Sequence, residues 1–273
     1  MGLEEDLAAE LGASSLGVEA TPAGGVVRLR VFFPCGGDAR GHLLEAESAL
    51  RDRGLDPAAC GLGVEPVEDG RWVERYQAGL RPLPLGERFV VIPGGDLRAE
   101  GSREPIHLVP GRAFGTGEHP TTRLCAAALE RLVRPGERWL DLGTGSGVLA
   151  IVAARCGAGH VEAVDDDPEA VEVARTVVEA NGASEKVSVR LGSADALAGA
   201  GFDGCVANIA TPYLLARAAD VAAVLHPSGL LVCSGLLGED AADVTAALGR
   251  AGFSVSERGD EGPWCLLVAR RSA

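Results

Sequence analysis

Three glycines and an aspartate stand at spacings that could bind a nucleoside. In the segment LDLGTGSG, residues 140–147, Gly143, Gly145 and Gly147 lie between an expected buried strand and a helix. Glycines let the main chain approach a ligand closely, and the start of the helix behind them favours negative charge. The next expected strand ends at Asp165, whose carboxylate can accept hydrogen bonds from both hydroxyls of a ribose. Together these residues predict a site for a nucleotide-type cofactor.

The glycine spacing separates this loop from the common nucleotide-binding loops. The dinucleotide fingerprint G-x-G-x-x-G requires its third glycine one position later, where this chain has Val148. A Walker loop requires G-K-S or G-K-T, which this segment lacks. A carboxylate at Asp165 disfavours NADP, because it would repel the 2′-phosphate. An NAD-dependent oxidoreductase and a noncatalytic cofactor-binding module remain alternatives at this point.

The elements that must position these residues alternate between strand and helix from residue 111 onward. Such alternation predicts a parallel, doubly wound sheet, in which ligands bind at the carboxyl ends of the strands. Asp167 is expected to cap the helix that begins at Pro168. Hydrophobic periodicity and turn residues predict strands at 138–142, 160–165, 187–191, 204–208, 230–235, 253–257 and 264–270, and helices at 121–133, 147–158, 168–182, 212–225 and 240–252.

The first part of the chain has a different pattern. We expect helices at 4–13 and 39–54 and a strand at 25–33, followed by a Pro- and Gly-rich stretch with one short strand at 88–93. The sequence therefore predicts a small α+β domain, a connector and a larger α/β domain, at residues 1–62, 63–104 and 105–273.

Composition and charge narrow the class of protein. The chain has 273 residues, of which 47% are hydrophobic, and a formal net charge of −14. A nonspecific nucleic-acid binder needs a basic face, so we expect no direct nucleic-acid binding. An acidic surface would instead suit a basic partner. No apolar run is long enough to span a membrane, and the acidic first residues are unlike a secretory signal. The seven scattered cysteines form no C-x-x-C pair, which favours free thiols, no metal site and a cytoplasmic location.

Four segments together carry a family resemblance. The strings AFGTGEHPTT, DLGTGSGVLAI, AVDDDPEAV and VANI closely resemble segments of the bacterial ribosomal protein L11 methyltransferases, and the likeness extends over residues 72–270. It implies a Rossmann-like class I methyltransferase domain with a seven-stranded, mostly parallel sheet. It also implies a small ferredoxin-like N-terminal domain that holds the substrate. The implied enzyme is an S-adenosylmethionine-dependent protein lysine methyltransferase.

The resemblance also implies which residues contact the cofactor. Three of them have an alternative structural role: Thr122 could cap a helix, Phe114 could belong to the core, and Asp195, which would receive the adenine amino group, could form a turn with Ser193. The full set expected to bind S-adenosylmethionine consists of Phe114, Thr122, Gly143, Gly145, Asp165, Asp195 and Asn208.

Asn208 is the expected catalytic residue. It ends the fourth strand of the alternating part, beside the expected methyl group, and its amide oxygen can accept a hydrogen bond from an amine nucleophile. Another methyltransferase family has N-P-P-Y here and stacks the target nitrogen on tyrosine. In this chain the residues after Asn208 are Ile-Ala-Thr-Pro-Tyr, which displaces Tyr213 and weakens that interpretation. His119 is expected to act as a hydrogen-bonding brace rather than a base.

The reaction that the resemblance implies is methyl transfer to amino groups of ribosomal protein L11. The targets are lysine side chains, and the N-terminal amine is a further possible target. The product would be S-adenosylhomocysteine, no metal is expected, and we expect a monomer. A lysine of another protein or a small molecule remains an alternative acceptor.

Overall fold

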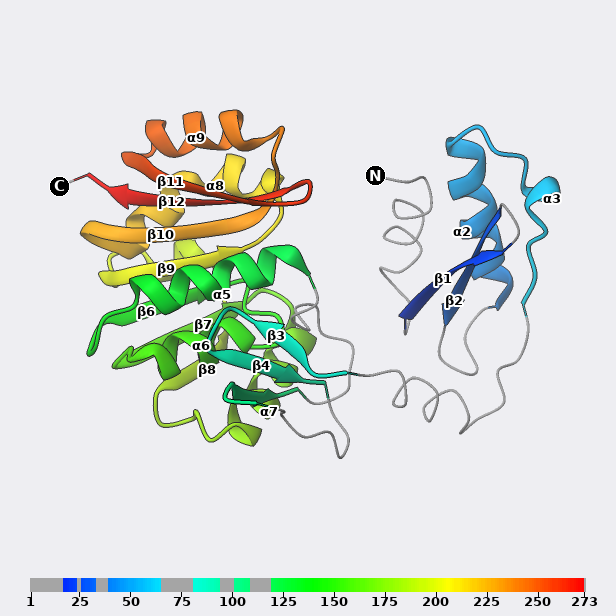
Figure 1. Cartoon of the computed structure of the whole chain (residues 1–273). Helices are drawn as coiled ribbons and strands as arrows, with labels where there is room; N and C mark the ends of the chain where they lie inside the picture. Colours follow the sequence, from blue (N-terminus) through cyan, green and yellow to red (C-terminus); the bar gives the residue numbers. More distant parts are fainter. Residues whose placement is uncertain are drawn as a thin grey trace. The chain divides into compact units, whose positions relative to one another are not determined.

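The structure, a computed structural model, describes residues 17–23, 26–32, 39–64, 81–93, 101–108 and 119–272 (Figure 1). The chain divides into two compact units, Met1–Arg75 and Tyr76–Ala273. Each unit is described by itself below.

A seven-stranded sheet forms the centre of the larger unit. Its strand order is β11-β12-β10-β9-β6-β7-β8, and the strands from β10 to β8 are all parallel. β12 runs antiparallel to both β10 and β11. This order confirms the predicted doubly wound, mostly parallel sheet. The strands are β6 (Arg138–Leu142), β7 (His160–Asp165), β8 (Val187–Leu191), β9 (Phe202–Asn208), β10 (Leu225–Leu237), β11 (Phe253–Glu261) and β12 (Trp264–Arg271).

Helices cover both faces of this sheet (Figure 1). Side chains alternate between the two faces along each strand, so Trp139 packs with α5, α6 and α7 whereas Leu140 packs with α8 and α9. All five predicted helices are present. The helices are α5 (Pro120–Leu132), α6 (Val148–Cys156), α7 (Pro168–Ala180), α8 (Thr211–Val224) and α9 (Ala241–Arg250), with a short 3₁₀ turn, η1 (Ala194–Leu197).

The start of β10 differs from the prediction. The segment His-Pro-Ser-Gly, residues 226–229, was expected to separate a helix from the strand, but the strand begins before it, at Leu225. The register with β9 shifts between Leu225 and Leu230, and Ser228 has a φ of +67°. A local irregularity of this kind bends a strand without ending it. In the sequence, the proline and the glycine of this segment indicate a turn and do not show that the strand continues through them.

A second sheet precedes the large one in the chain. It has three strands, in the order β3-β4-β5. Only β4, all of whose residues are buried, coincides with a predicted strand. The two outer strands contain Pro84 and Pro105, and proline is tolerated in an edge strand because its missing N–H costs no ladder bond there. The strand predicted at 88–93 is therefore confirmed, but the two outer strands were not predicted. The strands are β3 (Leu83–Leu85), β4 (Phe89–Ile92) and β5 (Glu104–His107).

Helix side chains attach this small sheet to the rest of the unit. The Glu130 carboxylate of α5 accepts hydrogen bonds from the main-chain N–H groups of Glu87 and Arg88, each 2.9 Å long. Asn181, directly after α7, accepts a bond from the His107 N–H at 2.9 Å and donates to the His107 carbonyl at 2.7 Å. The small sheet is thus held through its main chain.

The described part of the smaller unit contains strands and helices. β2 and α2 confirm the strand predicted at 25–33 and the helix predicted at 39–54, whereas β1, its antiparallel partner, was not predicted. The helix predicted at 4–13 lies outside the described residues. The ferredoxin-like arrangement stays a prediction. The elements are β1 (Gly17–Ala23), β2 (Val26–Phe32), α2 (Ala39–Asp52) and α3 (Pro57–Cys60).

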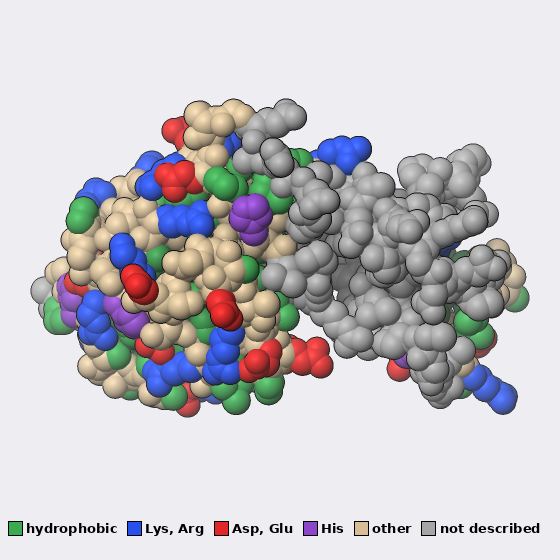
Figure 2. All heavy atoms as spheres, turned by 90° about the horizontal axis from the view of Figure 1, so that it is seen from below, with side chains coloured by type: hydrophobic (Ala, Val, Ile, Leu, Met, Phe, Trp, Pro, Cys, Tyr) green, Lys and Arg blue, Asp and Glu red, His purple; other side chains and the backbone are tan. Residues whose placement is uncertain are grey.

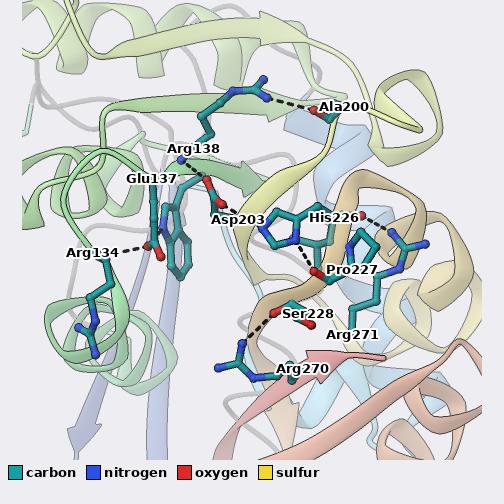
Figure 3. Close-up of polar contacts among 12 residues, drawn as sticks. Arg134, Glu137, Arg138, Ala200, Asp203, His226, Pro227, Ser228, Arg270 and Arg271 are labelled. Atoms are coloured by element: carbon teal, nitrogen blue, oxygen red, sulfur yellow. Dashed lines mark hydrogen bonds and ion pairs between the residues drawn. The ribbon is translucent and has the colours of Figure 1, made fainter. Parts of the chain in front are cut away.

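Polar contacts hold the amino-terminal edge of the large sheet (Figure 3). The Asp203 carboxylate accepts a 2.7 Å hydrogen bond from the Arg138 N–H and lies 2.9 Å from Nε2 of His226, which links β9 to β6 and β10. Arg270 donates to the Ser228 carbonyl at 2.7 Å. Because ligands of such sheets bind at the opposite, carboxyl edge, we assign these contacts to the frame of the fold.

Candidate active site

The glycine loop joins β6 to α6 at the carboxyl edge of the sheet. Gly143 has a φ of +70°, and a Cβ atom there would lie 2.5 Å from Cγ2 of Ile209. Gly147 is the N-cap of α6, with a φ of +81°. At Gly143 a side chain is excluded by both backbone conformation and space, and at Gly147 it is disfavoured by backbone conformation. These two positions therefore require glycine.

Asp165 ends β7 beside this loop. One of its carboxylate oxygens accepts a 2.8 Å hydrogen bond from the N–H of Gly145, and the other accepts a 3.1 Å bond from the N–H of Asp167. These contacts orient a half-buried carboxylate whose remaining lone pairs can accept bonds from ribose hydroxyls. Asp167 caps α7 through a 2.8 Å bond to the N–H of Glu169, which confirms its predicted role.

Asp141 is a site residue to which the sequence analysis assigned no role. Its buried Oδ2 accepts bonds from the Thr144 hydroxyl at 2.7 Å and the Ala150 N–H at 3.0 Å, so it ties the loop to α6. Its other oxygen, Oδ1, is buried without a hydrogen-bond partner among the described residues. Burial raises the pKa of Asp141 to about 7, and the nearby Asp165 adds to this rise. In the sequence, Asp141 could have been recognised as a site residue by its position in LDLGTGSG, two residues before the first glycine.

Thr122 and Asn208 meet at the same edge although 86 positions separate them. The side-chain amide of Asn208 donates to Oγ1 of Thr122 at 3.3 Å. Thr122 is buried in the first turn of α5, but the N-cap of that helix is His119, so the alternative role of Thr122 as the capping residue was wrong. With its amide nitrogen directed at Thr122, the Asn208 carbonyl oxygen is available to another donor.

His119 braces the start of α5. Its Nδ1 accepts from the N–H of Thr121 at 3.4 Å and lies 2.7 Å from the Thr121 hydroxyl, while its ring contacts Trp264 edge-on at 4.5 Å between centroids. Burial lowers the pKa of His119, and the positive charge of Arg123 lowers it further. These contacts agree with the predicted role as a brace.

The segment after Asn208 is held on several sides. The N–H of Ile209 donates to the Ser234 carbonyl at 3.1 Å, and a Cβ at Gly235 would lie 2.3 Å from the Ile209 carbonyl oxygen. The Thr211 hydroxyl donates to Asp240 at 2.9 Å. These contacts fix the main chain beside the candidate catalytic residue.

The remaining expected contacts are Asp195 and Phe114. Asp195 lies in η1, directly after β8, and its exposed carboxylate accepts a hydrogen bond from the Ser193 hydroxyl. This bond lowers the pKa of Asp195. The turn that Ser193 and Asp195 could form is thus present, and it leaves one oxygen of Asp195 without a bond from Ser193. Phe114 lies outside the described residues.

The residues at this edge fit S-adenosylmethionine. That molecule carries a positive sulfonium and an ammonium group, and the unpartnered Oδ1 of Asp141, beside the glycine loop, can accept a hydrogen bond from an ammonium group. Asp165 suits the ribose, whereas a 2′-phosphate would meet its negative charge. Among the described side chains, no group of three His, Cys, Asp or Glu residues could hold a metal ion. No described helix is both long and apolar enough to cross a membrane.

Comparisons with known proteins show the family of this chain. The family model described as Ribosomal protein L11 methyltransferase (PrmA) matches residues 25–272. A ribosomal protein L11 methyltransferase of Pelotomaculum thermopropionicum is 41% identical over 93% of this chain and 83% of its own length. One of Chloroflexus aurantiacus is 38% identical over 90% of this chain and 82% of its own length.

A solved structure supports the same assignment. The crystal structure of a ribosomal protein L11 methylase from Lactobacillus delbrueckii subsp. bulgaricus is 29% identical, with a TM-score of 0.63, and covers 71% of this chain and 100% of that one. Since the family match extends from residue 25 to residue 272, the chain belongs to the ribosomal protein L11 methyltransferase family.

Proposed function

We propose that this chain transfers methyl groups from S-adenosylmethionine to amino groups of ribosomal protein L11, on lysine side chains. Family membership supports the reaction, and the names of the relatives support the acceptor. The observation that carries the proposal is the hydrogen bond between Asn208 and Thr122, which presents the Asn208 carbonyl oxygen at the edge that holds the glycine loop. We also expect a monomer in the cytoplasm.

The cofactor would lie along the carboxyl ends of β6, β7 and β8. The main chain at Gly143 and Gly145 would receive its amino-acid end, and the orphaned oxygen of Asp141 would face its positive charge. Asp165 would accept bonds from the ribose hydroxyls, and Asp195 one from the adenine amino group. When bound, S-adenosylmethionine supplies a methyl group that its sulfonium sulfur already activates.

The acceptor has to be a neutral amine in line with that methyl group. A free lysine has a pKa of about 10.4 and is mostly protonated at neutral pH, but partial burial favours its neutral form. The Asn208 carbonyl oxygen would accept one amine N–H and so direct the nitrogen lone pair. Alignment of two reactants alone can supply an effective molarity on the order of 10⁵ M, so no dedicated base is needed. Methyl transfer would form a nitrogen–carbon bond as the sulfur–carbon bond breaks, and the amine proton would leave to solvent.

The protein partner would be recognised by the N-terminal domain. We propose that residues 1–62 bind it, residues 63–104 connect, and residues 105–273 catalyse. The net charge of −14 would favour a lysine-rich partner. The face of the larger unit in Figure 2 carries acidic and basic side chains side by side. Hydrogen exchange would test the recognition role: slower exchange within residues 1–62 when L11 is added would support it.

The test of the reaction is intact-mass spectrometry. Purified enzyme, S-adenosylmethionine and unmodified recombinant L11 should yield L11 species that differ by single methyl groups. Asp165→Ala should lose this activity, because it removes the ribose contact and the bond to the loop. Asp166→Ala, which removes the neighbouring exposed carboxylate, is the matched control and should retain it.

A negative result would also be informative. If L11 gains no mass while calorimetry records cofactor binding, the acceptor is another amine and the L11 proposal fails. If the cofactor does not bind, the assignment of the site itself fails.

A further inference from the structure

Ile209, directly after Asn208, has no role in the reaction proposed above, but it lies where two neighbouring strands part. β6 and β9 pair in parallel, and beyond their last pair the two chains bond to strands on opposite sides. The N–H of Gly143 donates to the Val164 carbonyl of β7 at 2.9 Å, whereas the N–H of Ile209 donates to the Ser234 carbonyl of β10 at 3.1 Å. The strand order also reverses between β6 and β9, and ligands of such sheets bind in the crevice at that point.

The side chain of Ile209 bridges the two chains where they separate. It is half-buried and packs against the apolar cluster that contains the buried residues of α8 and α9. Its Cγ2 methyl lies 2.5 Å from the point where a Cβ atom of Gly143 would stand. Apart from the adjacent residues of the chain, it is the only described atom within 4 Å of that point. A single methyl group thus makes this contact between the end of β9 and the glycine loop.

The main chain of Ile209 is held by a bulge in β10. The register between β10 and β12 shifts here, so that Ser234 and Gly235 together face a single residue of β12. The buried Ser234 hydroxyl donates to the Cys265 carbonyl at 2.8 Å. Gly235 has a φ of +86°, and a Cβ atom there would overlap the carbonyl oxygen of Ile209. The bulge therefore lets the chain after Asn208 lie directly against β10.

This arrangement matters because methyl transfer depends on the separation of donor and acceptor. A displacement of about 1 Å can lower a rate about 100-fold. The 3.3 Å bond from Asn208 to Thr122 orients the amide, but it is longer than the usual range of about 2.7–3.2 Å. Thr122 also belongs to α5 and not to the glycine loop. That bond therefore does not set the distance between Asn208 and the loop.

We propose that Ile209 is a positioning residue: seated on the bulge of β10 and in contact with Gly143 through its Cγ2 methyl, it sets the separation between the loop that holds the methyl donor and the Asn208 amide that directs the acceptor nitrogen. The inference rests on the proposed function, because it requires a donor at the loop. The role depends on branching at Cβ, which provides one γ carbon for Gly143 and another for the apolar cluster.

The experiment compares Ile209→Val with Ile209→Leu. Valine is smaller but keeps both γ carbons, whereas leucine keeps the volume and has one γ carbon, which cannot fill both places. The chain contains two asparagines, Asn181 and Asn208, so selective ¹⁵N-asparagine labelling gives two side-chain amides in an NMR spectrum of the cofactor-free protein. Asn181, bonded to the His107 carbonyl, is the internal reference. Ile209→Leu should move the Asn208 signals toward their positions in Thr122→Val, which lacks the bond, and Ile209→Val should not.

Kinetics with L11 as the acceptor give a second measurement. Ile209→Leu should lower kcat by about tenfold or more, because donor and acceptor are no longer aligned. Its KM for L11 and its affinity for S-adenosylhomocysteine in calorimetry should stay within about threefold of wild type, because neither ligand loses a hydrogen bond. Ile209→Val should keep kcat within about twofold of wild type.

The order of the two variants decides the inference. A general packing role would follow side-chain volume, so equal effects, or a larger effect of valine than of leucine, would overturn it. Weaker binding of S-adenosylhomocysteine by Ile209→Leu, with unchanged kcat and unchanged Asn208 signals, would assign the methyl contact to the cofactor alone and overturn it as well. If the wild-type protein transfers no methyl group to L11, the proposed acceptor fails, and the NMR comparison still decides the role of Ile209.

Discussion

Replacement of Asp141 by asparagine should change how stability depends on pH. Burial raises the pKa of Asp141 from 3.8 to about 7, so the native state retains this proton over an interval in which the unfolded chain has lost it. The native state then binds more protons than the unfolded state, and its stability decreases as pH rises through that interval. Asparagine does not titrate, and its amide oxygen can still accept the bonds from Thr144 and Ala150.

The magnitude follows from the size of the pKa shift. Each pKa unit corresponds to about 1.4 kcal/mol, so the full interval is worth about 4 kcal/mol. The part from pH 5 to pH 7 is worth about 2 kcal/mol, because the native carboxyl group has itself begun to lose its proton at pH 7. Over that part, the unfolding free energy of the wild-type protein should fall by about 2 kcal/mol relative to Asp141→Asn. The unfolding free energy of Asp141→Asn should therefore increase relative to that of the wild type as pH rises. This holds although the variant places an amide where the unpartnered carboxylate oxygen was.

Urea denaturation of the cofactor-free protein at a series of pH values measures this difference. Trp139, fully buried in β6 two residues before Asp141, provides a fluorescence signal for unfolding of the sheet. Asp167→Asn is the control, since asparagine caps a helix about as well as aspartate does and the residue is exposed. Stability curves of wild type and Asp141→Asn that stay parallel from pH 5 to pH 7 would refute the reasoning.

Three further substitutions test other contacts. Gly143→Ala should abolish cofactor binding in calorimetry, because the added Cβ would collide with an isoleucine methyl 2.5 Å away. Gly182 has a similar φ, but no atom lies within 4 Å of an added Cβ there. Gly182→Ala should therefore retain cofactor binding and lower the unfolding free energy by only about 1 kcal/mol. Thr122→Val should lower kcat about tenfold, because Asn208 loses the acceptor that orients its amide; Thr122→Ser should restore it, and equal rates in the two variants would contradict this role. Glu130→Ala should lower the urea unfolding free energy by about 1–3 kcal/mol, because two main-chain N–H groups lose their acceptor, with cofactor affinity unchanged; an unaltered midpoint would contradict the attachment of the small sheet.

Local features were predictable because they depend on residues near one another in the chain. The alternating strands and helices of residues 119–272, the glycine loop and the Asp167 cap follow from periodicity, backbone conformation and capping preference. The start of β10 and the edge strands β3 and β5 were not predicted, because they do not depend on nearby residues alone. Prolines and glycines there indicate turns locally, and only pairing with a neighbouring strand makes them part of a sheet.

By itself the sequence determined the order of the elements, the fold class and the family resemblance. It also placed Asp165, Asn208 and the glycine loop at strand ends, which a parallel sheet necessarily brings to one edge. The tertiary structure decided which groups meet there, above all Asn208 and Thr122, which are joined by a hydrogen bond. It also decided that one oxygen of Asp141 is buried without a partner. Burial and hydrogen bonding between distant segments depend on how helices pack on the sheet, and the order of residues along the chain does not contain that information.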